Sequence, residues 1–218
     1  NIFKILIMQP YNLENLEVEL KKRCKYPYIW GRKQNNSWDY QTNFVYKIYD
    51  FEALQENLKS FSQDLQNYAL NRWFNFWSAQ AVEQIFNKNE NVTRAENKFD
   101  KNKDFFINSI PFDHKSTVLP KKYNNTFEIN DENEQELLTW LYMNQSQQGR
   151  KHLKNRLFLV FYDKNTNDHW KLKAELTLID KVVDEYLSSF DELKLTKLEI
   201  DNNDIVTDLI WVQPNLLS

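Results

Sequence analysis

Apolar residues recur at helical spacing in the first third of the chain. Over residues 13 to 24 the leucines and valine follow this spacing, with acidic residues early and basic residues late, which predicts a short surface helix. Asp50 can cap a long helical tract from about Phe51 to Phe86, with a break near residues 60 to 63. The second half of this tract is apolar around most of its circumference, so we expect it to be largely buried.

Strand patterns fill much of the remaining chain. Residues 157 to 162 form a continuous apolar run, which predicts a strand buried on both faces. Residues 104 to 108 and 112 to 119 predict a β-hairpin, joined through Ser109, Ile110 and Pro111. Further strands are predicted at residues 2–8, 43–49, 91–95, 195–200 and 205–212, and further helices at residues 134–148 and 172–190.

The order of these elements predicts the fold class. A helix is followed by two or three strands, a helix, a buried strand, a helix and closing strands, which is typical of an α/β or α+β core with a central mixed β-sheet flanked by helices. We expect residues 1 to 50 to form an N-terminal appendage and residues 51 to 218 to form the main domain. Aromatic residues make up 15% of the chain and only 2 of 218 residues are glycine, which excludes a disordered or low-complexity chain.

Charge and cysteine content narrow the function classes. The net charge of −3 excludes a uniformly basic protein, although a nucleic-acid enzyme needs only a local basic surface. Cys24 is the single cysteine, and it makes no recognisable zinc pattern with His114, His152 and His169. Because Cys24 cannot form an internal disulfide, we expect a reducing, cytoplasmic location. Residues 2 to 8 are too few to span a bilayer and lack the flanks of a secretion signal. The chain opens on Asn1, and we expect a few residues to precede it.

The predicted hairpin carries the most informative chemistry. Asp113 and Lys115 are two residues apart on one strand and therefore share a face of it. Asp104 joins them if the hairpin pairs Asp104 with Lys115 and Phe106 with Asp113. The same register turns His114 to the other face, among the apolar residues of the core. Two carboxylates can hold a hard divalent cation, and a lysine beside them can contact a phosphate oxygen or an attacking water.

Other parts of the chain also contain the acid-x-lysine pattern. It occurs at Glu19 to Lys21, Glu96 to Lys98 and Glu192 to Lys194. The first copy lies in a predicted helix, where positions i and i+2 do not face each other, and the second lies in a charged loop. Only the copy at Asp113 combines a strand, an acid on the preceding strand and a preceding helix that carries a glutamate, Glu83.

This arrangement resembles the PD-(D/E)xK nuclease superfamily, which has the restriction-endonuclease-like fold. The resemblance covers about residues 66 to 163, where helix, three strands, helix and strand follow in the family's order. By position, Asp104 matches the first acid, Asp113 the second acid, Lys115 the lysine and Glu83 the helix glutamate. The second acid here is aspartate rather than the commoner glutamate, and Pro111 does not adjoin either acid.

The resemblance implies a metal-dependent endonuclease that hydrolyses phosphodiester bonds in DNA, in a defence, mobile-element or repair setting. Asp104, Asp113 and Glu83 would hold Mg²⁺, for which Mn²⁺ can substitute, and Lys115 would act on the attacking water or the developing charge. One alternative is a non-catalytic nucleic-acid-binding or complex-forming protein on a vestigial nuclease scaffold. Another is an ordinary exposed ion-pair cluster, with Glu83 as a helix carboxylate bound to water.

Basic residues near the hairpin predict the contact with nucleic acid. We expect phosphate contacts, and sequence-independent affinity, from Arg150, Lys151, Lys154, Arg156, Lys121 and Lys122. The alternative for the first four is a helix C-terminus whose bases complement the helix dipole. The expected partner is nucleic acid, DNA before RNA, and no membrane; a homodimer would suit cleavage of both strands. The aromatic, basic and amide side chains from Trp30 to Trp38 suit base stacking and base-edge contacts, or an ordinary polar loop.

Overall fold

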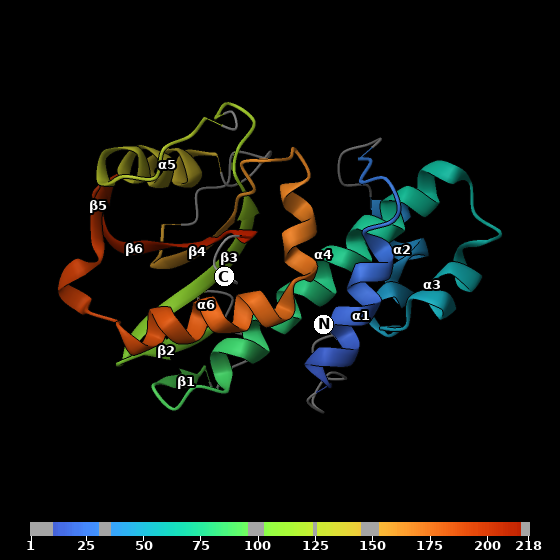
Figure 1. Cartoon of the computed structure of the whole chain (residues 1–218), viewed down its shortest axis with the longest axis horizontal. Coiled ribbons are helices and arrows are strands. Elements are labelled where there is room, and N and C mark those ends of the chain that lie inside the picture. The colour runs from blue at the N-terminus through green and yellow to red at the C-terminus, as the bar shows by residue number, and fades with distance from the viewer. Residues whose placement is uncertain (1–10, 31–35, 96–102, 124–125, 145–152, 215–218) are drawn as a thin grey trace. The chain divides into compact units, whose positions relative to one another are not determined.

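The computed structural model divides the chain into two compact units (Figure 1). It describes residues 11–30, 36–95, 103–123, 126–144 and 153–214, and the predicted strand at residues 2–8 lies outside them. The first unit spans residues 1–84 with 173–177, and the second spans residues 85–172 with 178–218. The expected appendage of residues 1–50 and main domain of residues 51–218 stay predictions, because compactness does not test which segment functions separately.

The described part of the first unit is helical. It contains α1 (Leu13–Arg23), α2 (Asn36–Gln41), the 3₁₀ helix η1 (Asn43–Tyr46), α3 (Phe51–Leu58) and most of α4 (Gln63–Asn87). The predicted helix near residues 13 to 24 and the predicted break between α3 and α4 are confirmed. Asp50 caps α3, since its side chain accepts a hydrogen bond from the backbone amide of Ala53 at 2.7 Å.

Two tryptophans of α4 explain why the predicted strand at residues 43 to 49 is wrong. The indole Nε1 of Trp73 donates to the Ile48 carbonyl at 2.6 Å, and Nε1 of Trp77 donates to the carbonyls of Val45 and Ile48 at 3.0 Å each. Backbone groups that a neighbouring strand would have paired are therefore satisfied by side chains. Trp73 is 0% exposed, which confirms the predicted burial of this part of α4.

The second unit is built on a six-stranded mixed sheet. Its strands are β1 (Val92–Arg94), β2 (Phe105–Ile107), β3 (Ile110–Val118), β4 (Arg156–Phe161), β5 (Thr196–Ile200) and β6 (Asn203–Val212). Their order in the sheet is β1-β2-β3-β4-β6-β5. β3, β4 and β6 run parallel to one another, while β1 with β2, β2 with β3, and β5 with β6 pair antiparallel. The predicted α+β class with a mixed sheet is confirmed.

Helices lie on both faces of this sheet, α5 on one and α6 on the other (Figure 1). α5 (Asp131–Met143) packs Leu137 and Leu141 into a cluster with Phe158 of β4 and Leu209 of β6. All six residues of β4 are buried, as the apolar run predicted. α6 (Leu176–Ser188) begins later than predicted because the 3₁₀ helix η2 (His169–Ala174) precedes it, and the short 3₁₀ helix η3 (Glu192–Lys194) follows it.

The turn of the β2–β3 hairpin is shorter than the sequence predicts. Asn108 and Ser109 have φ values of 46° and 72°, and Ile107 pairs with Ile110 across them. Two central residues with positive φ are the geometry of the two-residue hairpin turn, and asparagine tolerates it best among residues other than glycine. The strand β3 therefore starts at Ile110, before Pro111.

This turn shifts the register of the hairpin by two residues. Phe105 pairs with Phe112 and Phe106 pairs with Pro111. The predicted pairing of Asp104 with Lys115, and of Phe106 with Asp113, is therefore wrong. Ile107 and Ile110 flank the turn as a hydrogen-bonded pair, so Pro111 falls at the next, non-bonded position, where its missing N–H costs no bond to β2. A shift by an even number of residues leaves each β3 side chain on its predicted face.

Candidate active site

Asp113 lies at the first rung of the parallel ladder between β3 and β4. Its register partner is Arg156, whose Nε donates to Asp113 Oδ2 at 2.6 Å and whose Nη2 also contacts that oxygen. Lys154 Nζ is 3.9 Å from the other oxygen, Oδ1. The Asp113 backbone amide donates to the Asn155 carbonyl at 3.1 Å. The first paired residues of β3 and β4 thus hold one carboxylate beside two cations.

Lys115 adds a third cation to this group. Alternation along β3 gives it the same face of the strand as Asp113. Although Lys115 is exposed to solvent, surrounding protein atoms and then the charge of Arg156 lower the pKa of its ammonium group, while Asp113 opposes this shift. Among the described residues, Lys115, Lys154 and Arg156 are three cations around the Asp113 carboxylate, so this group favours an anion such as a phosphate group.

Asp104 contacts His114. It lies one residue before β2, and its Oδ2 accepts the His114 backbone amide at 3.0 Å. The same oxygen is 2.8 Å from His114 Nδ1, which must carry the proton because a carboxylate only accepts. The imidazole stacks on Phe105, with ring centroids 6.1 Å apart, and lies 6.4 Å from the ring of Phe86. The prediction that His114 turns into the core is confirmed.

The structure brings the two predicted acids to the same end of the hairpin. Asp104 precedes Phe105 and Asp113 follows Phe112, and these two phenylalanines are register partners. The Asp104 backbone amide donates to the Phe112 carbonyl at 2.8 Å, so the chain leaves the regular ladder at Asp104. This departure explains how Asp104 reaches His114 although the regular alternation would give it the Asp113 face.

Glu83 lies on α4 in the first unit, whereas the two aspartates belong to the second. Its Oε2 accepts a hydrogen bond from Gln80 Nε2 at 3.5 Å. Burial, followed by the Glu83 charge, raises the pKa of the Tyr11 hydroxyl. The expected role of Glu83 as a metal ligand stays a prediction.

The predicted phosphate contacts differ in their surroundings. Arg150 and Lys151 lie outside the described residues. Arg156 is only 5% exposed and binds Asp113, so it is better suited to orient that carboxylate than to meet a duplex. Lys121 is exposed, and Lys122 pairs with Glu136 at 3.1 Å. Of the predicted contacts that the structure describes, Arg156 and Lys154 adjoin Asp113 of the acid-x-lysine pair.

Two contacts of the site were not predicted from the sequence. The sequence placed Asp113 inside the predicted strand at residues 112 to 119 and Arg156 just before the strand at residues 157 to 162, but their contact depends on the parallel pairing of β3 with β4, which was not predicted. The Asp104–His114 pair had no signal in the sequence, since it depends on the backbone turning out of the ladder. The competing pattern at Glu19 to Lys21 lies in α1, the helix predicted for it, and the one at Glu192 to Lys194 lies in η3.

Mg²⁺ prefers oxygen ligands, which the carboxylates of the hairpin can supply. Among the described residues, no group of three or more histidine, cysteine, aspartate or glutamate side chains is arranged to hold a metal ion. Mg²⁺ commonly binds one or two carboxylates and takes its other ligands from water and substrate phosphates. One carboxylate, Asp104 or Asp113, is enough for that kind of site, in which the phosphate and water complete the ligand set. Asp113 would use Oδ1, because Oδ2 accepts from Arg156.

The fold and the site define a mixed α/β protein whose sheet carries an acid-x-lysine hairpin beside a basic strand start. No protein-family model, curated protein or solved structure matches the chain. In the part of the chain that the structure describes, no helix has both the length and the apolar character needed to cross a bilayer.

Proposed function

We propose that the protein is a metal-dependent endonuclease that hydrolyses phosphodiester bonds in DNA. The observation that carries the proposal is the position of Asp104, Asp113 and Lys115 toward one end of the β2–β3 hairpin, with Lys154 and Arg156 beside Asp113. The order of helix, three strands, helix and parallel strand over α4 to β4 also supports it, since this is the order that the resemblance to PD-(D/E)xK nucleases implies.

Each residue of the site would have its own role in phosphodiester hydrolysis. Arg156 orients the Asp113 carboxylate through Nε, and His114 orients that of Asp104 through Nδ1. Lys115 and Lys154 attract the scissile phosphate, and the lowered pKa of Lys115 makes its ammonium a better proton donor to a leaving oxygen. A magnesium or manganese ion, when bound by the two aspartates, would supply Lewis-acid polarisation of the phosphate.

Cleavage of nucleic acid tests the proposal directly. Supercoiled plasmid, linear duplex, single-stranded DNA and RNA would be incubated with the protein and Mg²⁺ or Mn²⁺, with a chelator in parallel. We expect metal-dependent cleavage of DNA that falls by about 100-fold or more in Asp104→Asn, Asp113→Asn and Lys115→Met. Each variant removes a charge from the site and keeps the size of the side chain.

A matched control comes from the acid-x-lysine pair at Glu192 and Lys194. Glu192 and Lys194 are exposed on η3, so Glu192→Gln and Lys194→Met should leave cleavage unchanged. Circular dichroism would verify that every variant is folded. Cleavage that persists in Asp113→Asn, or that the η3 substitutions reduce equally, would show that the nuclease activity does not come from this hairpin.

The contact between Arg156 and Asp113 favours a second candidate function. One carboxylate among three cations can bind a phosphate group without a metal ion, as expected of a nucleic-acid-binding protein on a vestigial nuclease scaffold. Fluorescence anisotropy with labelled DNA separates the two candidates. Salt-dependent binding that a chelator leaves intact, without cleavage in any metal, would favour the binding protein.

A further inference from the structure

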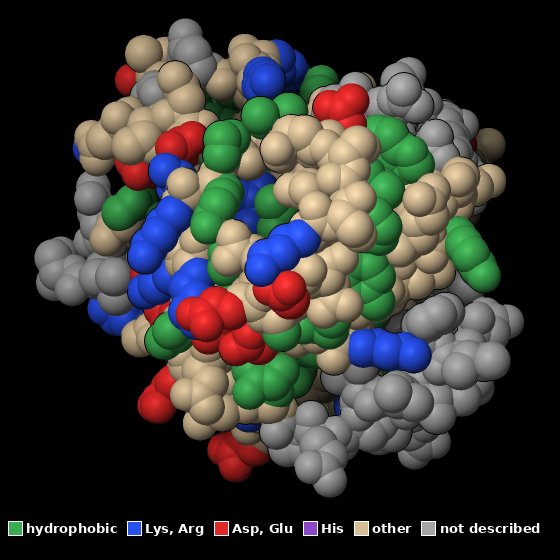
Figure 2. All heavy atoms as spheres, turned by 90° about the vertical axis from the view of Figure 1, so that its right-hand side faces the viewer, with side chains coloured by type: hydrophobic (Ala, Val, Ile, Leu, Met, Phe, Trp, Pro, Cys, Tyr) green, Lys and Arg blue, Asp and Glu red, His purple; other side chains and the backbone are tan. Residues whose placement is uncertain are grey.

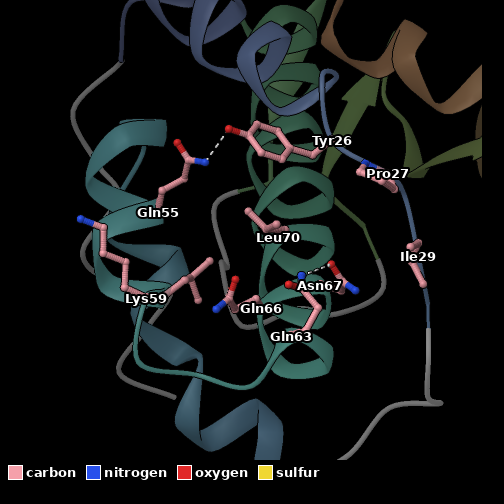
Figure 3. Close-up of a pocket in the computed structure, with 10 residues that line it drawn as sticks. Tyr26, Pro27, Ile29, Gln55, Lys59, Gln63, Gln66, Asn67 and Leu70 are labelled. Carbon is pink, nitrogen blue, oxygen red and sulfur yellow. Dashed lines mark hydrogen bonds between the residues drawn. The ribbon is translucent and has the colours of Figure 1, made fainter.

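A pocket in the first unit offers little selectivity for a ligand. It has a volume of about 710 Å³ and lies between α3, α4 and the segment around Pro27 (Figure 3). Figure 2, which faces the α3 side of the first unit, shows hydrophobic side chains at the surface beside acidic and basic ones. The pocket is lined by the amides of Gln55, Gln63, Gln66 and Asn67. Each amide carries both donors and an acceptor, so these polar groups favour no particular ligand.

The edge of the sheet at β5 is more specific in what it can pair with. Among the described residues, β6 is the one strand that pairs with β5, so the other side of β5 is an edge (Figure 1). Asp201 and Asn202 join the two strands with φ values of 51° and 59°, which is the geometry of the two-residue hairpin turn. Ile200 and Asn203 flank this turn and therefore form a hydrogen-bonded pair.

This turn decides which backbone groups of β5 point away from the sheet. Hydrogen-bonded pairs recur at every second residue from Ile200, so Lys197 and Glu199 turn their backbone groups away from β6. The register partner of Lys197 is Val206, whose amide donates to Asn155 Oδ1 at 3.0 Å instead of to β5, as this alternation requires. The edge thus offers the N–H and C=O groups of Lys197 and Glu199 to another strand.

The side chains at these two positions carry opposite charges. Lys197 and Glu199 are exposed and lie on one face of β5, while Leu198 and Ile200 pack on the other face, against the cluster beneath α5. Like charges on an edge strand prevent a second copy from pairing with it. A positive and a negative charge two residues apart repel a second copy only if it runs in the parallel direction, which sets like charges side by side.

An antiparallel second copy of β5 is complementary to this edge. When the two-fold axis passes beside Leu198, Lys197 of one protomer lies opposite Glu199 of the partner subunit, and the reverse pair forms on the other side of the axis. These are the positions whose backbone groups point outward, so both pairs can exchange N–H···O=C bonds. Backbone register and side-chain charge therefore favour the same arrangement.

We propose that β5 pairs with β5 of a second copy, so that the chain forms a dimer with one continuous sheet. Leu198 meets its counterpart on the α5 face of this sheet, and the ion pairs lie on the opposite face. β5 has 5 residues, so the interface is small and we expect a dissociation constant in the micromolar range. The proposal does not depend on phosphodiester cleavage, because no residue of the candidate active site lies on β5.

Sedimentation velocity of the full chain at about 1 to 500 μM tests the proposal. We expect a monomer–dimer equilibrium that shifts toward the dimer as concentration rises. A chain that stays monomeric over this range would overturn the proposal and leave the edge to water or to a strand of another protein.

Charge reversal tests whether β5 makes the dimer. Lys197→Glu sets an acid opposite Glu199 of the partner subunit, and Glu199→Lys sets two bases together, so each should weaken dimerisation by about tenfold or more. An equimolar mixture of the two variants should dimerise as well as the unsubstituted protein, because each variant supplies the charge that the other requires. The chain with both substitutions should also dimerise, since the opposite charges face each other again.

Matched controls make the same charge changes away from β5. Glu90 is exposed before β1, at the opposite edge of the sheet, and Lys164 is exposed after β4. Glu90→Lys and Lys164→Glu should therefore leave the equilibrium unchanged, and circular dichroism would verify that every variant is folded. Dimers that persist in both folded β5 variants, or a mixture of these variants that stays monomeric, would contradict the proposed pairing.

Discussion

Arg156 and Asp113 face each other across the first rung of the β3–β4 ladder, with Arg156 Nε 2.6 Å from Asp113 Oδ2. The guanidinium is buried and also lies over the ring of Phe158, 5.8 Å from its centroid. Tyr142, whose hydroxyl donates to the Lys154 carbonyl at 2.9 Å, belongs to the same group, and burial raises its pKa to about 12. The charged pair therefore borders the core of the sheet. Removing one partner leaves the other charge unpaired there, which lowers the stability of the fold.

We expect Arg156→Met to destabilise the protein by about 2 kcal/mol, because Asp113 loses a charge-assisted hydrogen bond in a poorly solvated place. Asp113→Asn should cost less, since the asparagine carbonyl can still accept from Arg156. The double variant should be more stable than the sum of the single effects implies. Urea unfolding of all four proteins measures the coupling, and additive effects would mean that the pair contributes nothing to stability.

The neutral form of His114 should carry its proton on Nδ1, because that nitrogen faces the Asp104 carboxylate at 2.8 Å. Nitrogen NMR of ¹⁵N-labelled protein distinguishes the two tautomers by their ring couplings. In Asp104→Leu the preference should weaken, while His169, whose Nδ1 accepts from the Asp163 backbone amide at 3.0 Å, should keep an Nε2–H tautomer. An Nε2–H signal for His114 in the unsubstituted protein would contradict the assigned contact.

Ser109→Gly should stabilise the protein by about 0.5 to 1 kcal/mol. Ser109 holds φ at 72°, where its Cβ is strained and glycine is not. Ser109→Ala keeps the strain and should give no gain. The turn between β5 and β6 provides a comparison: Asn202, with φ of 59°, should gain less from Asn202→Gly because asparagine tolerates this region. Thermal unfolding measures all three, and equal effects of glycine and alanine at position 109 would refute the argument.

Asp208 should make stability fall as pH rises through its range. Burial raises the pKa of its carboxyl, and hydrogen bonds from the Leu209 amide and the Tyr186 hydroxyl oppose the shift. A carboxyl whose folded pKa exceeds its unfolded value, about 3.9, contributes stability that is complete below that value and is lost as pH rises through the folded pKa. Relative to Asp208→Asn, the unsubstituted protein should therefore be less stable at pH 7 than at pH 4.

Tyr186→Phe extends this test. Without the Tyr186 hydroxyl, the ionised carboxylate loses one of its donors, so the pKa of Asp208 should rise further and the loss of stability should reach higher pH. Chemical unfolding at a series of pH values, with each variant compared against Asp208→Asn, gives the readout. If the difference in unfolding free energy between the unsubstituted protein and Asp208→Asn did not vary with pH, Asp208 would titrate alike in the folded and unfolded chains.

Local sequence patterns were sufficient for most elements of the sheet and its helices. The run from Leu157 to Tyr162 predicted β4 because a strand covered on both faces consists mostly of apolar residues. The failure at residues 43 to 49 has a tertiary cause: the strand-like residues Phe44, Val45 and Tyr46 form η1, whose neighbouring carbonyls are bound by the tryptophans of α4. Nothing in the sequence of residues 43 to 49 indicates that tryptophan side chains of α4 will bind these carbonyls.

For the candidate site, the sequence by itself determined which residues share a strand face: Asp113 with Lys115, and His114 turned inward. That follows from the period of two along a strand, which no register shift along β3 can alter. The tertiary structure decided the rest. The Asn108–Ser109 turn set the register, the parallel start of β4 brought Arg156 to Asp113, and a bend at Asp104 joined that acid to His114. These contacts depend on where distant backbone segments meet, which alternation along one strand does not specify.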